Sequence, residues 1–397
     1  MSEIQLKIYP ALDGDSFLLS IEDTHILIDG GYVSTYNDHI KNDLITIHQK
    51  NQLLSHVIIT HIDRDHISGI VKFLEENNKD RVIEISNIWH NAYRHLPKQA
   101  SIKKELISLE NKSLINEIKG GSYLKNSTID NKNISSKQGS SLGALILEGG
   151  YSWNSEFGNK AIAIENLQNV SINEEIELIL LSPNNEKLQK LEKAWKKDLE
   201  RGGYKGKITE DSIFDDAFEF MIAKQKPKKY SKEQNISSSK FSMDKLLESK
   251  FIEDATTANG SSLAFIIKYK DKNLLFLGDS HPSLVLQQLK KYYNTQSSPI
   301  YFDLIKVSHH GSWNNTSPEL LSFIDSENII FSTNGKKHSH PHSETIANFI
   351  SRKCEFKRKL YFNYTTSTSQ LFDQDMKSGY NYEIITAEPN QPLILSI

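Results

Sequence analysis

The stretch Thr60-His61-Ile62-Asp63-Arg64-Asp65-His66 directly follows the apolar run His56-Val57-Ile58-Ile59. The apolar run is typical of a short buried strand, and the polar stretch places four potential metal ligands where that strand should end. Side chains alternate along an extended segment, so His61, Asp63 and Asp65 can converge on one point. From His66 onward, apolar residues recur at spacings of three and four, which predicts a helix. A strand, a ligand cluster and a helix together predict a metal site at the carboxyl edge of a β-sheet.

Four further strand-like runs end in the same residue types. They precede Asp29-Gly30-Gly31, Gly278-Asp279-Ser280, Ser308-His309-His310-Gly311-Ser312 and the segment His338-Ser339-His340-Pro341-His342. The motif at 61–66 and these segments hold seven of the fourteen histidines of the chain. A polar surface loop rich in His and Asp is the alternative for the first motif, but scattered surface histidines would not coincide with strand ends in this way.

Composition is that of an ordinary soluble protein. The 397 residues are 38% hydrophobic and carry a formal charge of −3, which argues against a globally basic nucleic-acid coat. Cys354 is the only cysteine, so neither an intrachain disulfide nor a cysteine-rich zinc site can form. Neither a signal peptide nor a membrane-length apolar run is apparent, and a cytoplasmic protein without membrane contact is therefore expected.

Strand signals at both ends of the chain indicate one domain formed by two packed sheets with helices outside. Its core is expected from residues 1–100 and 250–397, with 101–249 as a polar, largely helical insertion. A strand at 176–181 and a helix at 184–203 are predicted within that insertion. Residues 224–242 are rich in Lys and Ser and are predicted to be a mobile linker.

These motifs resemble those of the metallo-β-lactamase superfamily. The match consists of His61-x-Asp63-x-Asp65-His66, Asp279, a histidine within 338–342, and Asp29-Gly30-Gly31 as the early Asp-Gly turn. Within the superfamily, the hydrolase domains of ComEC-type DNA-uptake competence proteins are most similar. They share Asp in place of the second histidine, Gly14-Asp15-Ser16, an Asn-Gly-Ser-Ser-Leu segment at 259–263, and the His-His-Gly-Ser and His-Pro-His segments. The resemblance implies an αββα sandwich and a metal-dependent hydrolase.

The resemblance also implies a ligand set. His61 and Asp63 are expected to bind a first ion, and Asp65, His66 and His340 a second, with Asp279 between the two. The third histidine of the superfamily is missing, and Ser261 or Ser262 stands in its neighbourhood. Carboxylate-rich ligation favours two Mn²⁺ or Mg²⁺ ions, with Zn²⁺ as the alternative.

Other residues are assigned to the chemistry around these ions. His309 or His310 is the candidate for protonating a leaving group, with direct ligation as the alternative for His309. Asp65 is counted with the two histidines as catalytic. Asp29 and Ser312 are expected to support the ligands from behind, and the amides of 311–312 are expected to approach a phosphate.

Three classes of function fit this pattern. A two-metal phosphodiesterase or nuclease acting on DNA or RNA is favoured, because Asp63, Asp65 and Asp279 balance only three of the four positive charges of two divalent ions. The alternative is a hydrolase of small thioesters or lactones. A metal-stabilised binding module without activity is the third.

Overall fold

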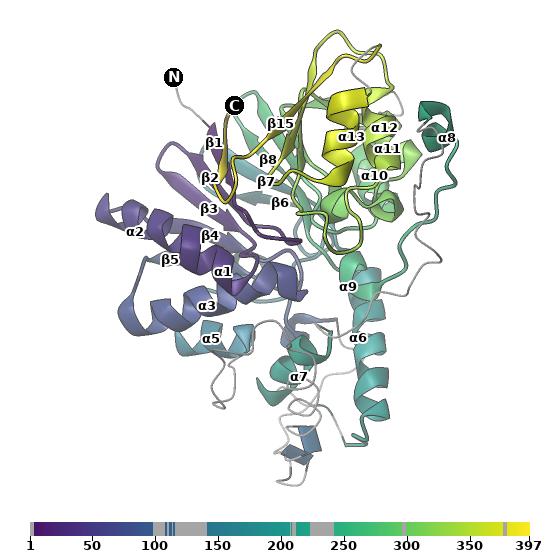
Figure 1. Ribbon diagram of the computed structural model, residues 1–397. Coiled ribbons are helices and arrows are strands. Elements are labelled where there is room, and N and C mark those ends of the chain that lie inside the picture. Colours follow the sequence, from purple (N-terminus) through teal and green to yellow (C-terminus); the bar gives the residue numbers. More distant parts are fainter. Residues whose placement is uncertain are drawn as a thin grey trace.

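Two β-sheets pack face to face, and helices cover both outer faces (Figure 1). This arrangement, seen in a computed structural model, is the αββα sandwich that the sequence predicts. The structure describes residues 4–97, 141–206, 212–222, 242–295, 299–375 and 379–397, with isolated positions at 108, 111–112, 114–115 and 208. The predicted linker 224–242, apart from Ser242, and most of the polar stretch 101–139 lie outside the described residues.

The smaller sheet is built by the two ends of the chain, with the strand order β16-β1-β2-β3-β4-β5. Its strands are β1 (Ile4–Ile8), β2 (Phe17–Ile21), β3 (Thr24–Ile28), β4 (Leu54–Ile58), β5 (Ile85–Trp89) and β16 (Leu393–Ser396). β3, β4 and β5 are parallel to one another. The neighbouring pairs β16–β1, β1–β2 and β2–β3 are antiparallel. The predicted strand before Asp29 corresponds to β3, and the predicted strand before Thr60 corresponds to β4.

The larger sheet has the order β15-β14-β13-β11-β9-β8-β7-β6. Its strands are β6 (Asn169–Ser171), β7 (Ile176–Ser182), β8 (Ala264–Tyr269), β9 (Lys272–Phe276), β11 (Leu304–Lys306), β13 (Asn328–Phe331), β14 (Arg358–Phe362) and β15 (Tyr382–Thr386). A separate parallel pair joins β10 (Ile300–Phe302) to β12 (Ile324–Ser326). β6 and β7 lie within the span expected to decorate the core, yet they extend this sheet.

Helices divide between the two outer faces and an extension. A π-helical turn (Tyr36–Ile40) and α2 (Lys41–Gln49), α3 (Arg64–Asp80) and α5 (Leu142–Glu148) pack on the smaller sheet, preceded by the single turn α1 (Val33–Thr35). The larger sheet is covered by α8 (Met243–Leu247), α10 (Pro282–Tyr292), α11 (Pro318–Phe323), α12 (Ser343–Ile350) and α13 (Ser367–Asp375). The long α6 (Asn185–Arg201), α7 (Ser212–Ile222) and short α9 (Thr257–Gly260) form an apolar cluster of their own at one end (Figure 1).

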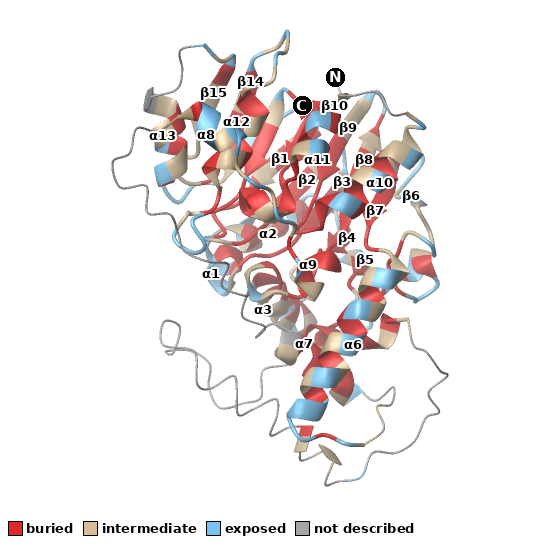
Figure 2. Ribbon diagram, turned by 90° about the vertical axis from the view of Figure 1, so that its right-hand side faces the viewer, coloured by how far each residue is buried: buried red, intermediate tan, exposed pale blue. Residues whose placement is uncertain are grey.

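The core between the sheets consists mainly of strand residues from both. Leu6 and Leu19 of the smaller sheet share one apolar cluster with Phe265 and Phe276 of the larger sheet. Figure 2 shows these strands as buried, while the outer surfaces of the helices are exposed. Alternating apolar residues are buried on both faces because helices cover the second face of each sheet.

The parallel strands fix the position of the polar loops. β3 and β4 in one sheet and β9 and β11 in the other end toward the same edge of the sandwich, where residues 29, 60–66, 279 and 308–312 follow them. Distant parts of the sequence therefore meet at one edge. Among the described residues, no helix has the length and apolar character needed to cross a membrane.

Candidate metal centre

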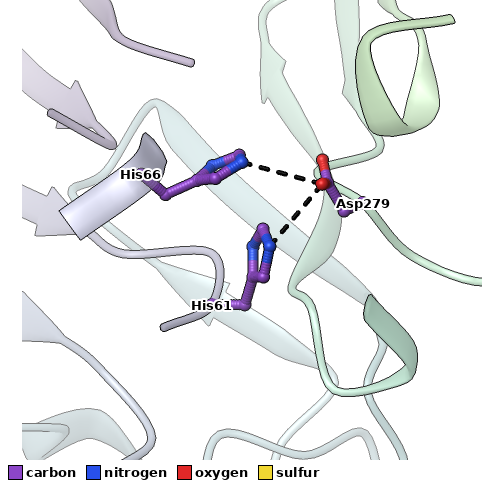
Figure 3. A group of neighbouring side chains, drawn as sticks. All are labelled: His61, His66 and Asp279. Carbon is purple, nitrogen blue, oxygen red and sulfur yellow. Dashed lines mark ion pairs between the residues drawn. The ribbon is translucent and has the colours of Figure 1, made fainter. Parts of the chain in front are cut away.

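Asp279 lies at the middle of a ring of histidines. Its Oδ2 atom is 3.6 Å from Nε2 of His61 and 3.6 Å from Nε2 of His66 (Figure 3). The Nε2 atoms of His309 and His310 are 3.7 Å and 3.9 Å from the same oxygen. Four imidazoles from two loops of the chain thus face one buried carboxylate from a third.

Local backbone geometry explains how these loops come so close. Gly278 precedes Asp279 with φ +49, and a Cβ atom there would lie 2.5 Å from the Leu263 carbonyl oxygen. Glycine is therefore required for β9 to turn tightly into the site. On the other side, α3 begins at Arg64, which places Asp65 and His66 in its first turn.

Three overlapping groups of side chains have the spacing of metal ligands. They are His61, His66 and Asp279; Asp65, His66 and His310; and Asp15, Asp29 and His66, with the ligand atoms of each group within 4.8 Å of one another. The third group is already engaged in protein contacts. Asp29 accepts hydrogen bonds from the Thr60 amide and hydroxyl and lies 2.8 Å from Nδ1 of His66.

Unpartnered buried atoms show that the first two groups fit a metal. Among the described residues, Nε2 of His61, His66 and His310 and Oδ1 of Asp279 are buried without a hydrogen-bond partner. Buried polar atoms are normally hydrogen-bonded, so four such atoms facing one another need an explanation. Divalent cations would satisfy all four, and these imidazole and carboxylate donors are ligands that such ions accept.

In His66 and His310, a hydrogen bond to Nδ1 leaves Nε2 free to face the centre. Nδ1 of His66 faces the Asp29 carboxylate, and Nδ1 of His310 lies 2.9 Å from the Ser332 carbonyl oxygen. Because both partners are acceptors, each Nδ1 carries the hydrogen and each Nε2 presents a lone pair to the centre. Behind His61, the Thr60 hydroxyl is 3.0 Å from Nδ1 and donates to Asp29, so it can accept the Nδ1 hydrogen. The Ser262 hydroxyl is 3.4 Å from the same Nδ1 and accepts a hydrogen bond from the Asp279 amide.

The carboxylates concentrate negative potential at this point. Burial alone would lower the pKa of His66, but Asp29 and Asp279 outweigh it and raise that pKa well above its usual value. Burial alone would raise the pKa of Asp279, but His309, His310, His66 and His61 lower it well below its usual value. The site thus attracts positive charge, which a bound metal would supply in place of protons.

His309 and His310 have different environments although they are adjacent. Both have left-handed backbone conformations, with φ 46 and φ 55, so the chain turns sharply at each of them. The His310 side chain is buried with the ligands, whereas the His309 side chain is 24% exposed and its Nδ1 lies 2.8 Å from Oδ1 of Asn315. His310 therefore lies among the candidate ligands, and His309 is the more exposed of the two imidazoles.

His340 and Asp63 have less central positions than the sequence predicts. His340 is in none of the three groups; its ring packs against His309, with 5.0 Å between ring centroids. Burial, reinforced by His309, lowers its pKa well below the usual value, so the ring is neutral. Asp63 lies at the open side, with Oδ2 3.7 Å from Nε2 of His61 and a side chain that is 34% exposed.

The Ser312 amide is not free for the predicted contact with a phosphate. The Ser312 amide already donates to the His309 carbonyl oxygen at 2.8 Å, so the loop itself uses this donor. Gly311 is required for packing, because a Cβ atom there would lie 2.6 Å from Cβ of Pro341. Ser312 is buried and supports the turn that directs His309 and His310.

Two charged residues behind the site were not assigned a definite role from the sequence. Asp15 is buried, forms an ion pair with Lys306, and lies 3.2 Å from Nδ1 of His310. The available signal was Lys306 itself, since a lysine in an apolar strand is rarely buried without a partner. His90 is in none of the three ligand groups; it pairs with Glu219 and stacks on Trp153.

The charges of Asp15 and Lys306 cancel, and Asp29 adds one negative charge to those of Asp63, Asp65 and Asp279. The carboxylates of Asp15, Asp29, Asp63, Asp65 and Asp279 and the ammonium of Lys306 together carry a formal charge of −4. Two divalent cations would balance that charge. The residual positive charge expected from three carboxylates is therefore not present in the complete set of neighbours.

Comparison with known proteins adds a family to this geometry. Residues 9–119, which include β2 to β5 and the His61–His66 loop, match the family model described as the metallo-beta-lactamase superfamily. The chain has a metallo-β-lactamase fold. The match supports membership of the superfamily, whose members are mostly hydrolases dependent on divalent metals.

Other comparisons add little. The search of curated proteins finds no match. Among solved structures, the chain is similar to the metallo-beta-lactamase fold protein YhfI from Bacillus subtilis, with 10% identity over 100% of both chains and a TM-score of 0.39. A similarity at that level carries no argument about the site.

Proposed function

We propose that the protein is a two-metal phosphodiesterase that cleaves DNA, RNA or a related phosphodiester. One observation carries the proposal. Two ligand groups share His66, both face Asp279, and a partly exposed imidazole, His309, lies beside them. The arrangement combines carboxylate-rich ligation with a proton donor, which is the combination that phosphodiester cleavage requires.

The ligands divide between two ions. His61 and Asp63 would hold the first, and Asp65, His66 and His310 the second, with Asp279 between them. His66 can serve only one ion, because Asp29 occupies its other ring nitrogen. His310 thus replaces His340 in the ligand set expected from the sequence. Mn²⁺ or Mg²⁺ remains the proposed metal because of the carboxylates, with Zn²⁺ as the alternative.

A pair of bound divalent cations would supply an activated water and stabilise charge on the leaving oxygen. The chain itself contributes binding and proton transfer. The Nε2 atom of His309 points toward Asp279 and can deliver a proton to a leaving group bound above it. His61, His66 and His310 are held with fixed ring orientations, which limits reorganisation during the reaction.

Recognition of an anionic substrate is supported at the open side of the site. Lys337 is 54% exposed and lies 2.9 Å from Asp13. Burial opposes its charge, but Asp65, Asp13 and Asp63 raise its pKa, which indicates that its ammonium lies near the ligand carboxylates. We propose Lys337 as a phosphate-binding residue and nucleic acid, as in the ComEC-type hydrolases, as the substrate class.

The proposal is tested with metal-stripped protein reloaded with Mn²⁺, Mg²⁺ or Zn²⁺. Substrates are a chromogenic phosphodiester, single- and double-stranded DNA, RNA, a thioester and a lactone. We expect metal-dependent phosphodiester cleavage that is lost in Asp65→Ala and slowed by ~10²–10⁴-fold in His309→Ala. Asp38→Asn, an exposed position on the π-helical turn, is the control. Efficient thioester or lactone hydrolysis with every phosphodiester left intact would refute the proposal.

A further inference from the structure

A hydrogen-bonded chain leads away from His309 into the protein. Nδ1 of His309 is 2.8 Å from Oδ1 of Asn315. The two Nδ2 contacts of Asn315 are the Asp254 carboxylate at 3.2 Å and the Asp279 backbone carbonyl at 3.1 Å. Both are acceptors, so they fix the amide orientation of Asn315 and leave its oxygen facing His309.

Asp254 is the anchor of this chain. It is buried, and its carboxylate accepts hydrogen bonds from the Thr256 amide at 2.9 Å, the Thr256 hydroxyl at 2.8 Å and Nδ2 of Asn259 at 2.6 Å. With Asn315 included, four donors converge on one side chain. Only an ionised carboxylate accepts all of them without offering a competing donor.

We propose that Asp254 is a positioning residue for His309. Acting through Asn315, it holds the hydrogen of the His309 ring on Nδ1 and directs Nε2 toward the metal centre. The catalytic consequence rests on the proposed function, whereas the ring tautomer does not. With Nδ1 engaged by Asn315, Nε2 is the ring nitrogen that takes up a proton and delivers it to a leaving group.

Asn259 offers the competing arrangement. Its Nδ2 is 3.3 Å from Nδ1 of His309, and in that arrangement Asn259 would donate to a ring with the hydrogen on Nε2. The Asn315 contact is shorter, and Asp254 holds Nδ2 of Asn259 much more closely. Geometry therefore favours Asn315 as the partner of His309.

Helix α6, which belongs to the predicted insertion, also contributes to the surroundings of Asp254. Nζ of Lys187 is 2.6 Å from Nδ1 of His281, and since an ammonium only donates, the His281 hydrogen is on Nε2. That Nε2 atom is 3.8 Å from Oδ2 of Asp254. The His281 ring thus directs an N–H toward the Asp254 carboxylate.

The test combines spectroscopy and kinetics on Mg²⁺- or Zn²⁺-loaded protein, since both ions are diamagnetic. Ring nitrogen chemical shifts of ¹⁵N-histidine protein, assigned with His309→Ala, report the tautomer. We expect the Nδ1–H tautomer in the wild type and its loss in Asp254→Asn and Asn315→Ala. Asn314→Ala is the matched control, because that neighbouring side chain donates to Ile252.

Kinetics separate positioning from general loss of structure. In Asp254→Asn and Asn315→Ala we expect kcat to fall by about 10–100-fold with poor leaving groups, less with p-nitrophenolate, and KM and bound metal to stay unchanged. Asn315→Ala keeps the test valid if Asp254→Asn fails to fold. An Nε2–H tautomer in the wild type, or an unchanged tautomer in both variants, would overturn the proposal. Without phosphodiesterase activity, the proposed function would fail while the spectroscopic result still decides this inference.

Discussion

His310 and His340 compete for one role, that of the histidine beside Asp65 and His66. Nε2 of His310 is 3.8 Å from Oδ2 of Asp65, whereas His340 is outside all three ligand groups. We therefore expect His310→Ala to lose about one equivalent of metal and His340→Ala to retain it. Elemental analysis after dialysis measures both. Metal loss confined to His340→Ala would restore the assignment made from the sequence.

The Asp29 carboxylate orients His66 and Thr60 through three hydrogen bonds. An asparagine has nearly the same shape, but its NH₂ group would face one of the donors that the carboxylate now accepts from. Asp29→Asn is expected to weaken metal binding by about 10–100-fold, as loss of a partner behind a ligand generally does. Competition with a chelator measures the affinity. Wild-type affinity would show that Asp29 does not orient the ligand.

Residue types were easier to predict than residue roles. His61, Asp65, His66 and Asp279 could be selected because each follows an apolar strand, and the structure brings them together. The choice between His310 and His340 depends on the left-handed conformations of His309 and His310, which no residue pattern reveals. Lys306 was visible as a charge inside a strand, but its partner Asp15 is far away in the sequence.

At the scale of elements, α3 must lie very close to the turn after β3. A Cβ atom on Gly69 would lie 2.0 Å from the Gly30 carbonyl oxygen, and that oxygen cannot move without displacing Asp29. Gly69→Ala is expected to destabilise the protein by about 1–3 kcal/mol. Urea unfolding measures the change, with Ser68→Ala on the same helix as a control expected within about 0.5 kcal/mol. Equal stability of both variants would contradict this packing.

Glu76 connects α3 to the preceding helical segment. Burial alone would raise its pKa, but Lys41, Lys72 and Tyr36 lower it to about 2. A lowered pKa in the folded state stabilises the protein above the unfolded pKa of ~4.3 and loses that effect as the pH falls toward 2. Because the side chain is partly exposed, we expect less than about 1 kcal/mol. Glu76→Gln should reduce the slope of the unfolding free energy against pH between pH 5 and 3. A slope equal to that of the wild type would contradict this.

The sequence predicts strands well where an apolar run ends in a turn, as at β3, β4, β9, β11 and β13. It also predicts the helix at 184–203, which is α6 at Asn185–Arg201. What the runs do not reveal is sheet membership. β7 pairs with β8 across a long stretch of intervening sequence, so a strand from the expected insertion belongs to the larger sheet.

At the scale of the whole molecule, the centre depends on the packing of two sheets. His61 and His66 follow a strand of the smaller sheet, and Asp279 and His310 follow strands of the larger one. Metal binding should therefore stabilise the contact between the sheets, because each of the two proposed ligand sets takes residues from both sheets. Two divalent cations would only balance the formal charge of the site. Affinity for an anionic substrate should therefore depend on local groups such as Lys337 and decrease with added salt.

Asp279 tests the account most directly, since it faces every imidazole of the centre. The measurement is the metal content of wild type and Asp279→Ala after identical loading and dialysis, with circular dichroism as a check on folding. We predict about two divalent ions per wild-type chain and a clear loss in the variant, with the fold retained. A folded variant with undiminished metal content, or a wild type that binds no divalent metal, would contradict the account.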